Sequence, residues 1–204
     1  STAARSDFGK KGMLADGSAQ SLNQRTIAQL QAKQVTVTLE LSKVANGRGM
    51  PYTFNGKQFY FNTAFISAYD NMIGRMNSQG AQVTVILVAD QGAPGTMVSP
   101  YALDGLGAHN YYGLNAATPE GAETLAALGS FLANRWSNKT WMGSVAKVDN
   151  WIVGNEVNAW NQWNYMNIGG NLPVYAQEYA NAFRMLYNGI KSENANANVY
   201  VCTD

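Results

Sequence analysis

Apolar runs of four to eight residues alternate with longer amphipathic segments along this 204-residue chain, and no other feature limits its fold as strongly. The clearest run, 83–90, reads VTVILVAD, which is typical of a strand covered on both faces. Strands that alternate with helices predict βαβ units and a parallel sheet. The predicted strands span 10–14, 35–41, 83–90, 151–155 and 198–204. The predicted helices begin near Ser21, Asn62, Thr118 and Pro173.

The connections between these elements are unequal in length. Loops that follow strands are long and aromatic, and one of them contains a hairpin predicted at 52–60 around Asn55-Gly56. Loops that lead from a helix to a strand, such as 78–80, are short. This asymmetry favours an α/β fold of the (β/α)8 TIM-barrel type, with its site at the carboxyl ends of the strands. An open nucleotide-binding sheet is disfavoured, because no Gly-x-Gly-x-x-Gly follows a strand.

The length predicts one domain over residues 1–204 that forms only part of such a barrel. A complete barrel typically needs about 250 residues. Five predicted strands and four predicted helices correspond to its amino-terminal portion, and the last strand is reached without a helix to cover it. A partner is therefore expected, either the remaining half of the barrel or a second copy that pairs through the exposed sheet edges.

Composition excludes several classes of function. The formal net charge is +1 and charged residues make up 13%, so nothing favours nucleic acid or an anionic membrane. No apolar stretch approaches the roughly 20 residues of a membrane span. Cys202 and His109 are the only cysteine and histidine, so no metal-ligand spacing is present and no cofactor is expected. The chain begins Ser-Thr-Ala-Ala, as a processed protein does, and a secreted location is the expectation.

The predicted strand at 151–155 ends in a pair of polar residues, Asn155 and Glu156. In folds with parallel strands, ligands bind at the carboxyl ends of the strands. A glutamate at that place is a candidate general acid or base, and Asn155 beside it is a candidate to hydrogen-bond a hydroxylated substrate. Gly154 before them is expected to allow close approach of a backbone or ligand. The alternative is a solvated carboxylate or one that caps the next helix.

Further candidates for substrate binding lie in the loops near this strand end. Sugar sites pair flat aromatic faces with polar groups, because a pyranose has an apolar face that stacks on a ring. The aromatic candidates are Trp160, Trp163 and Tyr165, and the polar candidates are Asn158, His109 and Asp90. The alternative for the rings is loop packing. For the polar groups the alternatives are turn formation, a structural hydrogen bond or capping.

The segment 151–158 (WIVGNEVN) resembles the strand-four signature of clan A glycoside hydrolases, in which an Asn-Glu pair carries the general acid/base. The resemblance implies a retaining O-glycosyl hydrolase that acts on an oligo- or polysaccharide, with Glu156 as acid/base and Asn155 bound to the hydroxyl next to the reacting carbon. The family's nucleophilic glutamate stands at the end of strand seven, which lies beyond this sequence. The wider pattern is similar to an uncharacterised bacterial branch of that superfamily, at 10–12, 54–57, 130–136 and 182–184.

A different class of function is also compatible with these residues. A non-catalytic carbohydrate-binding or scaffold module would keep the cleft but lack the second carboxylate. An enzyme would lose turnover when Glu156 is replaced by glutamine, whereas a binding module would keep most of its affinity for sugar.

Overall fold

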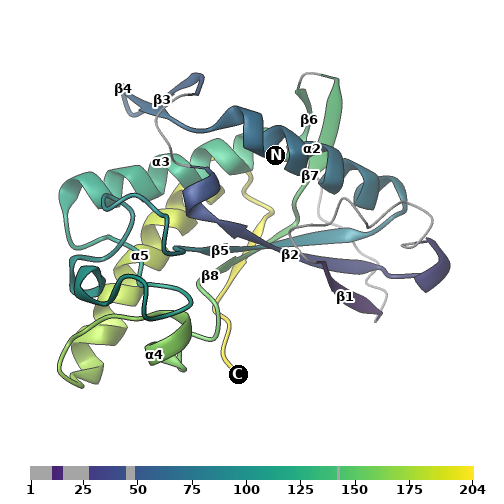
Figure 1. Cartoon of the computed structure of the whole chain (residues 1–204). Helices are drawn as coiled ribbons and strands as arrows, with labels where there is room; N and C mark the ends of the chain where they lie inside the picture. The colour runs from purple at the N-terminus through teal and green to yellow at the C-terminus, as the bar shows by residue number, and fades with distance from the viewer. Residues whose placement is uncertain (1–10, 16–27, 45–48, 142) are drawn as a thin grey trace.

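The structure is a computed structural model that describes residues 11–15, 28–44, 49–141 and 143–204 (Figure 1). Its centre is a five-stranded parallel sheet. The strands are β1 (Gly12–Ala15), β2 (Gln34–Glu40), β5 (Gln82–Val88), β8 (Asn150–Val153) and β9 (Asn198–Tyr200). Each strand pairs with the next one along the chain, in the order β1-β2-β5-β8-β9. This order has no reversal point, so the sheet is the wall of a barrel and not a doubly wound sheet.

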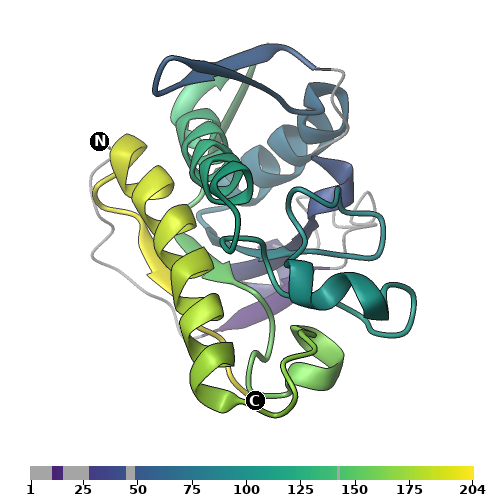
Figure 2. The same cartoon turned by 90° about the vertical axis from the view of Figure 1, so that its left-hand side faces the viewer.

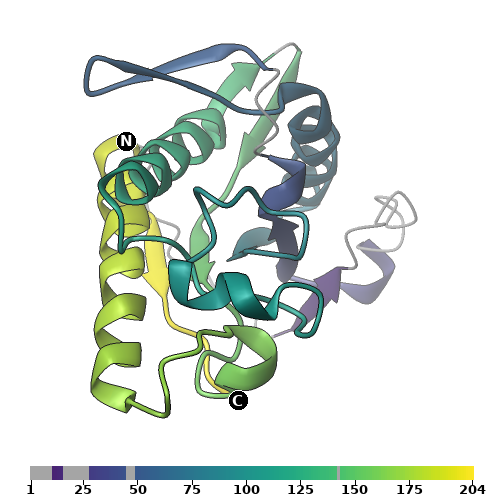
Figure 3. The ribbon, with the colours of Figure 1, turned by 60° about the vertical axis from the view of Figure 1, so that its left-hand side comes forward.

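Three long helices lie along one face of this wall (Figures 2 and 3). They are α2 (Thr63–Ser78), α3 (Pro119–Arg135) and α5 (Leu172–Glu193). The odd-numbered residues of β2 from Val35 to Leu39 are fully buried in the core that the helices cover. The even-numbered residues from Thr36 to Glu40 are only half-buried, because they point to the opposite, open face. The predicted partial TIM barrel is therefore the architecture that the chain adopts.

The starts of the helices follow the sequence signals. The side chains of Asn62 and Thr118 cap α2 and α3, where they accept hydrogen bonds from Phe65 N at 3.2 Å and Gly121 N at 3.1 Å. The fourth predicted helix begins one residue before Pro173, and Asn171 caps it. The capping box predicted at Ser21 lies outside the described residues. No helix in the described ranges is long and apolar enough to cross a membrane.

Helices α3 and α5 approach each other closely because glycines stand where they cross. A Cβ atom at Gly129 would lie 2.7 Å from Leu186 O, and one at Gly189 would lie 2.1 Å from Ala126 O. Both distances are too short for any other residue, so the crossing depends on these two positions.

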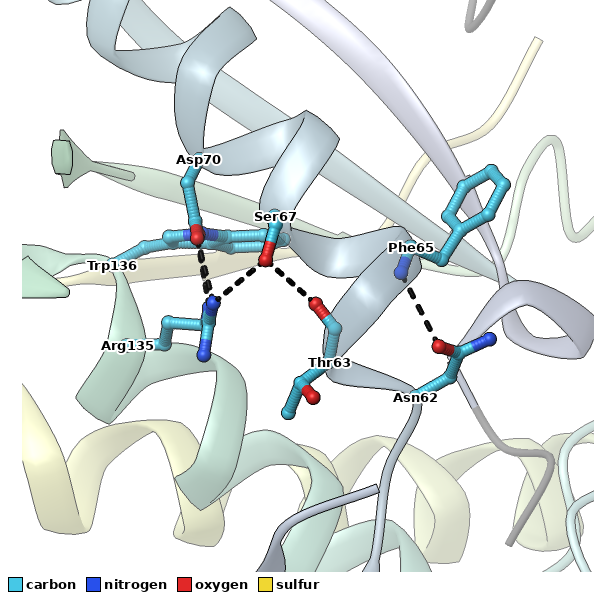
Figure 4. A network of polar contacts seen from close by, with 7 residues as sticks. All are labelled: Asn62, Thr63, Phe65, Ser67, Asp70, Arg135 and Trp136. Carbon is cyan, nitrogen blue, oxygen red and sulfur yellow. Dashed lines mark hydrogen bonds and ion pairs between the residues drawn. The ribbon is translucent and has the colours of Figure 1, made fainter. Parts of the chain in front are cut away.

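A buried polar network joins α2 to the end of α3 (Figure 4). Asp70 accepts hydrogen bonds from Arg135 Nε at 2.9 Å, Arg135 Nη2 at 2.7 Å and Trp136 Nε1 at 2.8 Å. The side chains of Asp70 and Arg135 are only 5% and 2% exposed. Because both charges are paired and hydrogen-bonded, their burial is tolerated and the two helices are held in one register.

Two hairpins and several short helices complete the described part of the chain. The predicted hairpin forms, with Asn55 and Gly56 at φ 48° and 77° in its turn. It lies against α3, where Tyr52 meets the ring of Phe131 edge-on at 5.4 Å. A second hairpin was not predicted. The remaining elements are β3 (Pro51–Phe54) and β4 (Lys57–Tyr60), β6 (Ser137–Trp141) and β7 (Ser144–Lys147), the 3-10 helices η2 (Leu41–Lys43) and η3 (Pro100–Gly105), and α4 (Trp160–Trp163).

Candidate active site

The loop after β8 turns sharply through two residues with left-handed backbone conformations. Gly154 has φ 73°, and its N–H still donates to Leu87 O at 2.9 Å, as the last bond of the ladder. Glu156 has φ 40°, which is unfavourable for a residue with a Cβ atom. Gly154 therefore serves the turn, and its lack of a Cβ atom also makes room for Val157, whose Cγ1 would lie 2.9 Å from such an atom. Strained residues of this kind concentrate at functional sites, which makes Glu156 a candidate on conformational grounds as well.

Two tyrosines of α5 hold this loop in place through hydrogen bonds to its backbone. Tyr179 donates a hydrogen bond to Val153 O at 2.8 Å, and Tyr175 donates to Val157 O at 2.6 Å. Tyr175 also accepts a bond from Asn164 Nδ2 at 2.7 Å. Burial raises the pKa of both phenols, so they remain protonated donors at physiological pH. These anchors flank Glu156 on both sides along the chain, and no local pattern in the sequence indicates them.

The side chains of Asn155 and Glu156 are half-buried and unbonded. Within the part of the chain that the structure describes, no hydrogen bond or ion pair joins either side chain to another residue. Most polar groups of folded proteins that are shielded from water find a partner in the protein. The Asn155 amide and the Glu156 carboxylate are not among the buried polar atoms that lack a partner, so both groups reach solvent and are accessible to a ligand.

Asn158 differs from these two residues, because its amide is bonded within the protein. Its Oδ1 accepts a hydrogen bond from Asp204 N at 3.1 Å, and its Nδ2 donates to the Asp204 carboxylate. Nearby, Val157 N donates to Cys202 O at 3.0 Å. Asn158 thus joins the loop after β8 to the segment after β9, and this contact uses one donor and one acceptor position of its amide.

Three of the predicted ring residues, His109, Trp160 and Tyr165, come together where the loops after β5 and β8 meet. His109 stacks on Tyr165 with their ring centroids 3.7 Å apart, and Trp160 lies nearly parallel to Tyr165 at 6.3 Å. The rings of Trp163 and Tyr111 have their centroids 5.8 Å apart. The Nδ1–H of His109 donates to Asn161 O at 2.5 Å, so this histidine also ties the two loops together. Trp160, at 44% exposed, offers an open indole face.

Asp90 stands at the end of β5 and connects two loops. Its Oδ1 accepts a hydrogen bond from Ser42 N at 2.9 Å, and its Oδ2 accepts a weaker one from Gly92 N at 3.4 Å.

Glu40 ends β2 on the open face, where Lys43 Nζ lies 2.9 Å from its carboxylate. Burial and the carboxylates of Glu40 and Asp90 raise the pKa of the Tyr111 hydroxyl. The sequence did not show to which side of the sheet Glu40 points.

A metal centre finds no support in this arrangement. Among the described residues, no three His, Cys, Asp or Glu side chains are grouped closely enough to hold a metal ion. The chemistry available at the strand ends is that of carboxylates, amides and aromatic rings.

The sequence profile of DUF5722, a family of unknown function, matches residues 3–204. The chain belongs to this family. No curated protein matches it. Two solved structures resemble this DUF5722 chain, the first being Fpglu1 from Fervidobacterium pennivoraus, with a TM-score of 0.57 and 17% identity over 89% of this chain. The second is a hyperthermophilic β-glucosidase from Pyrococcus furiosus, with a TM-score of 0.52 and 15% identity over 84% of this chain.

These two similarities show the fold, which is that of part of a TIM barrel. The chain spans 41% of the length of each solved structure. Within this chain β8 pairs in parallel with β5 and β9, and Asn155 and Glu156 follow its carboxyl end.

Proposed function

We propose that this chain is the acid/base-bearing part of a retaining O-glycosyl hydrolase and that Glu156 is its general acid/base. The proposal is carried by one observation, the half-buried pair of Asn155 and Glu156 at the carboxyl end of β8, whose side chains bond to no other residue in the described ranges. Support comes from the TIM-barrel fold, whose strand ends carry the catalytic residues of such enzymes. The strained backbone of Glu156 agrees with a functional role for this residue.

The reaction assigns a separate task to each group. Glu156 gives its proton to the glycosidic oxygen as the bond to the anomeric carbon breaks, and a second carboxylate attacks that carbon to form a glycosyl ester. Glu156 then takes a proton from water, whose oxygen displaces the ester and releases the sugar. Asn155 binds the sugar hydroxyl next to the reacting carbon.

The second carboxylate comes, on this proposal, from the remainder of the barrel. In retaining enzymes it stands about 5–5.5 Å from the acid/base. The carboxylates that the described strands offer at this rim are already engaged. Asp90 accepts backbone hydrogen bonds, Glu40 is paired with Lys43 and Asp204 is bonded to Asn158. The solved structures that resemble this chain are more than twice as long, which leaves ample room for such a residue.

The open face and the edges of the sheet support the same partner. Leu14 on β1 is 69% exposed and Tyr200 on β9 is 48% exposed, although both belong to strands of the central sheet. Each of these strands has an unpaired edge within the described sheet. Unpaired edges and apolar faces invite strands from a partner, which here is the rest of the barrel or a second copy of this chain.

The test is turnover of nitrophenyl glycosides by the chain, expressed with whatever coding sequence flanks these 204 residues. Glu156→Gln is expected to lower kcat about 100-fold or more, because general acid–base catalysis contributes about 10²–10⁴-fold. Azide, which needs no base, is expected to restore release of nitrophenol and to yield a glycosyl azide. The matched control, Glu178→Gln on α5, is expected to retain full activity. Unchanged turnover in Glu156→Gln would refute the proposal.

A non-catalytic sugar-binding module is the second candidate. Two observations favour it. The rings of His109 and Trp160 pack on Tyr165, which supplies flat faces for a sugar, and the described strands supply no free second carboxylate. Calorimetric titration with oligosaccharides separates the two candidates. A binding module keeps its affinity in Glu156→Gln and shows no turnover with or without flanking sequence.

A further inference from the structure

A pocket of about 200 Å³ lies beside the loop that carries Glu156. Its wall is formed by the residues that follow Glu156, by the segment before α5 and by the first turns of that helix. The lining residues on which its chemistry depends are Val157, Asn158, Trp160, Ile168, Leu172 and Tyr175. The pocket is thus built into the same loop as the proposed acid/base.

The polar groups in this lining are already bonded within the protein. The hydroxyl of Tyr175 donates to Val157 O and accepts from Asn164 Nδ2, and the amide of Asn158 is bonded to Asp204. What remains toward the pocket is the spare donor and acceptor capacity of the Asn158 amide, the indole of Trp160 and the aliphatic side chains of Ile168 and Leu172. Leu172 is 70% exposed, although it lies at the first position of a helix. An exposed leucine beside an exposed tryptophan leaves an apolar surface for a ligand to cover.

We infer that this pocket receives the leaving group of the substrate and that this group is apolar, an aryl or alkyl aglycone and not a second sugar. The inference rests on the proposed function. A proton donor must reach the glycosidic oxygen, so the leaving group lies next to Glu156 and its loop. A sugar placed in this pocket would find only the spare positions of the Asn158 amide and the indole N–H of Trp160, so most of its hydroxyls would lose their water without a partner, at about 1–3 kcal/mol for each. An aryl or alkyl group loses no hydrogen bond and buries apolar surface.

The size of the pocket agrees with a single ring or a short chain. A closed apolar cavity of about 150 Å³ is known to hold benzene. A pocket of about 200 Å³ therefore accommodates a phenyl group with some room to spare. The indole of Trp160 supplies a flat face on which an aryl group stacks.

The first experiment measures binding alone, with phenol as the probe and the 204-residue chain in a calorimeter. Saturable binding is expected, and Trp160→Ala is expected to weaken it about tenfold through loss of the stacking face. Leu172→Ser is expected to weaken it less. Glu156→Gln and the distant control Tyr60→Ala, which also removes an exposed ring, are expected to bind as the unmodified chain does. Absence of saturable binding, or equal affinity in Trp160→Ala and Tyr60→Ala, would overturn the inference.

The second experiment compares kcat/KM for a phenyl glycoside and for a disaccharide with the same reacting sugar, using the chain with its flanking coding sequence. The phenyl glycoside is expected to be preferred, and Leu172→Ser is expected to reduce kcat/KM for this substrate only. Preference for the disaccharide, with equal effects of Leu172→Ser on both, would overturn the inference and leave the proposed function standing. Phenol binding without turnover of any glycoside would instead refute the proposed function, and the leaving-group assignment with it.

Discussion

Two polar clusters of this molecule differ in how far the protein itself satisfies them. In the first, Asp70, Arg135 and Trp136 exchange hydrogen bonds in the core and leave little capacity unused. In the second, Asn155 and Glu156 stand half-buried at a strand end without any bond to a described side chain. Polar groups that bind one another in the core hold the fold together, whereas half-buried polar groups that no described side chain satisfies stay accessible to water and to a ligand.

The backbone shows the same contrast. Asp70 lies within a regular helix, where its conformation is relaxed. Glu156 is held at φ 40° by a loop whose ends are anchored by Tyr179 and Tyr175. In the described part of the chain, no hydrogen bond of the Glu156 side chain offsets the cost of this backbone conformation. The difference therefore separates a structural cluster from a functional one, and it predicts how stability responds to substitution at each.

The largest effect on stability is expected at the buried cluster. Asp70→Asn removes the charge that balances Arg135 in the core, and breaking a buried ion pair typically destabilises a protein by about 3–5 kcal/mol. Urea unfolding of the 204-residue chain measures the change. The double variant Asp70→Asn with Arg135→Met is expected to recover part of the loss, because no unpaired charge remains. A loss below about 1 kcal/mol in the single variant would mean that water reaches Arg135.

Much of the first cluster's setting was predictable from sequence, because local signals determine it. The apolar stripe of α2 and the caps Asn62 and Thr118 depend on residues within one or two turns. The turn at Asn55-Gly56 requires only two residues with positive φ. The second hairpin escaped prediction, because its turn has no Asn-Gly and its strands are short and polar.

The candidate site was predictable only in part. Glu156 and Asn155 were identified because they end an apolar run. The partners of Asp90 and Asn158 lie 48 and 46 residues away in the chain, and such pairings depend on the tertiary fold. The orientation of Glu40 depends on the register of β2 against β5. A one-residue shift would turn it to the other face, so residue order alone left it open.

The next effect concerns a buried group of α2, the hydroxyl of Tyr69, which donates to Thr38 O at 3.0 Å. Burial, with the carboxylate of Glu40 and the phenol of Tyr111, raises its pKa from 10.0 to about 12. Below pH 10 this phenol is protonated in both the folded and the unfolded chain, so its contribution to stability is fully present. Above pH 10 the unfolded chain loses the proton first, and stability falls by about 1.4 kcal/mol per pH unit up to about pH 12.

This pH dependence is measured by comparing urea unfolding of the unmodified chain and of Tyr69→Phe at pH 8, 9, 10 and 11. The advantage of the unmodified chain is expected to be about 1 kcal/mol at pH 8, from the hydrogen bond, and to shrink above pH 10. Other buried tyrosines titrate equally in both proteins and cancel in the difference. Tyr60→Phe, an exposed control, is expected to show no such trend. A constant difference up to pH 11 would mean that the phenol is not shielded from water.

Substitution of Glu156 is expected to have a smaller effect on the free energy of unfolding, and here one substitution stabilises the fold relative to another. At Glu156, glycine is expected to be more stabilising than alanine by about 1 kcal/mol, because a Cβ atom is unfavourable in the left-handed region. Glu178 inside α5 is the matched control, and there the alanine variant is expected to be more stable than the glycine variant by about 1 kcal/mol. Thermal unfolding of the four variants measures both differences. The same order at both positions would show that the backbone of Glu156 is relaxed, and the contrast between the two clusters would lose its conformational half.

The smallest effect is expected at an ion pair on the surface, which separates the influence of burial from that of charge. Lys57 Nζ lies 2.6 Å from the Glu123 carboxylate, as close as Arg135 is to Asp70, but the two side chains are 62% and 48% exposed. Water screens this pair, so Lys57→Met is expected to change the free energy of unfolding by less than about 1 kcal/mol. A double-mutant cycle with Glu123→Gln isolates the coupling between the two charges. A coupling above about 2 kcal/mol would show that a short distance between two charges is enough for a strong ion pair. Burial would then not be the reason that the Asp70 cluster stabilises the fold more than this surface pair does.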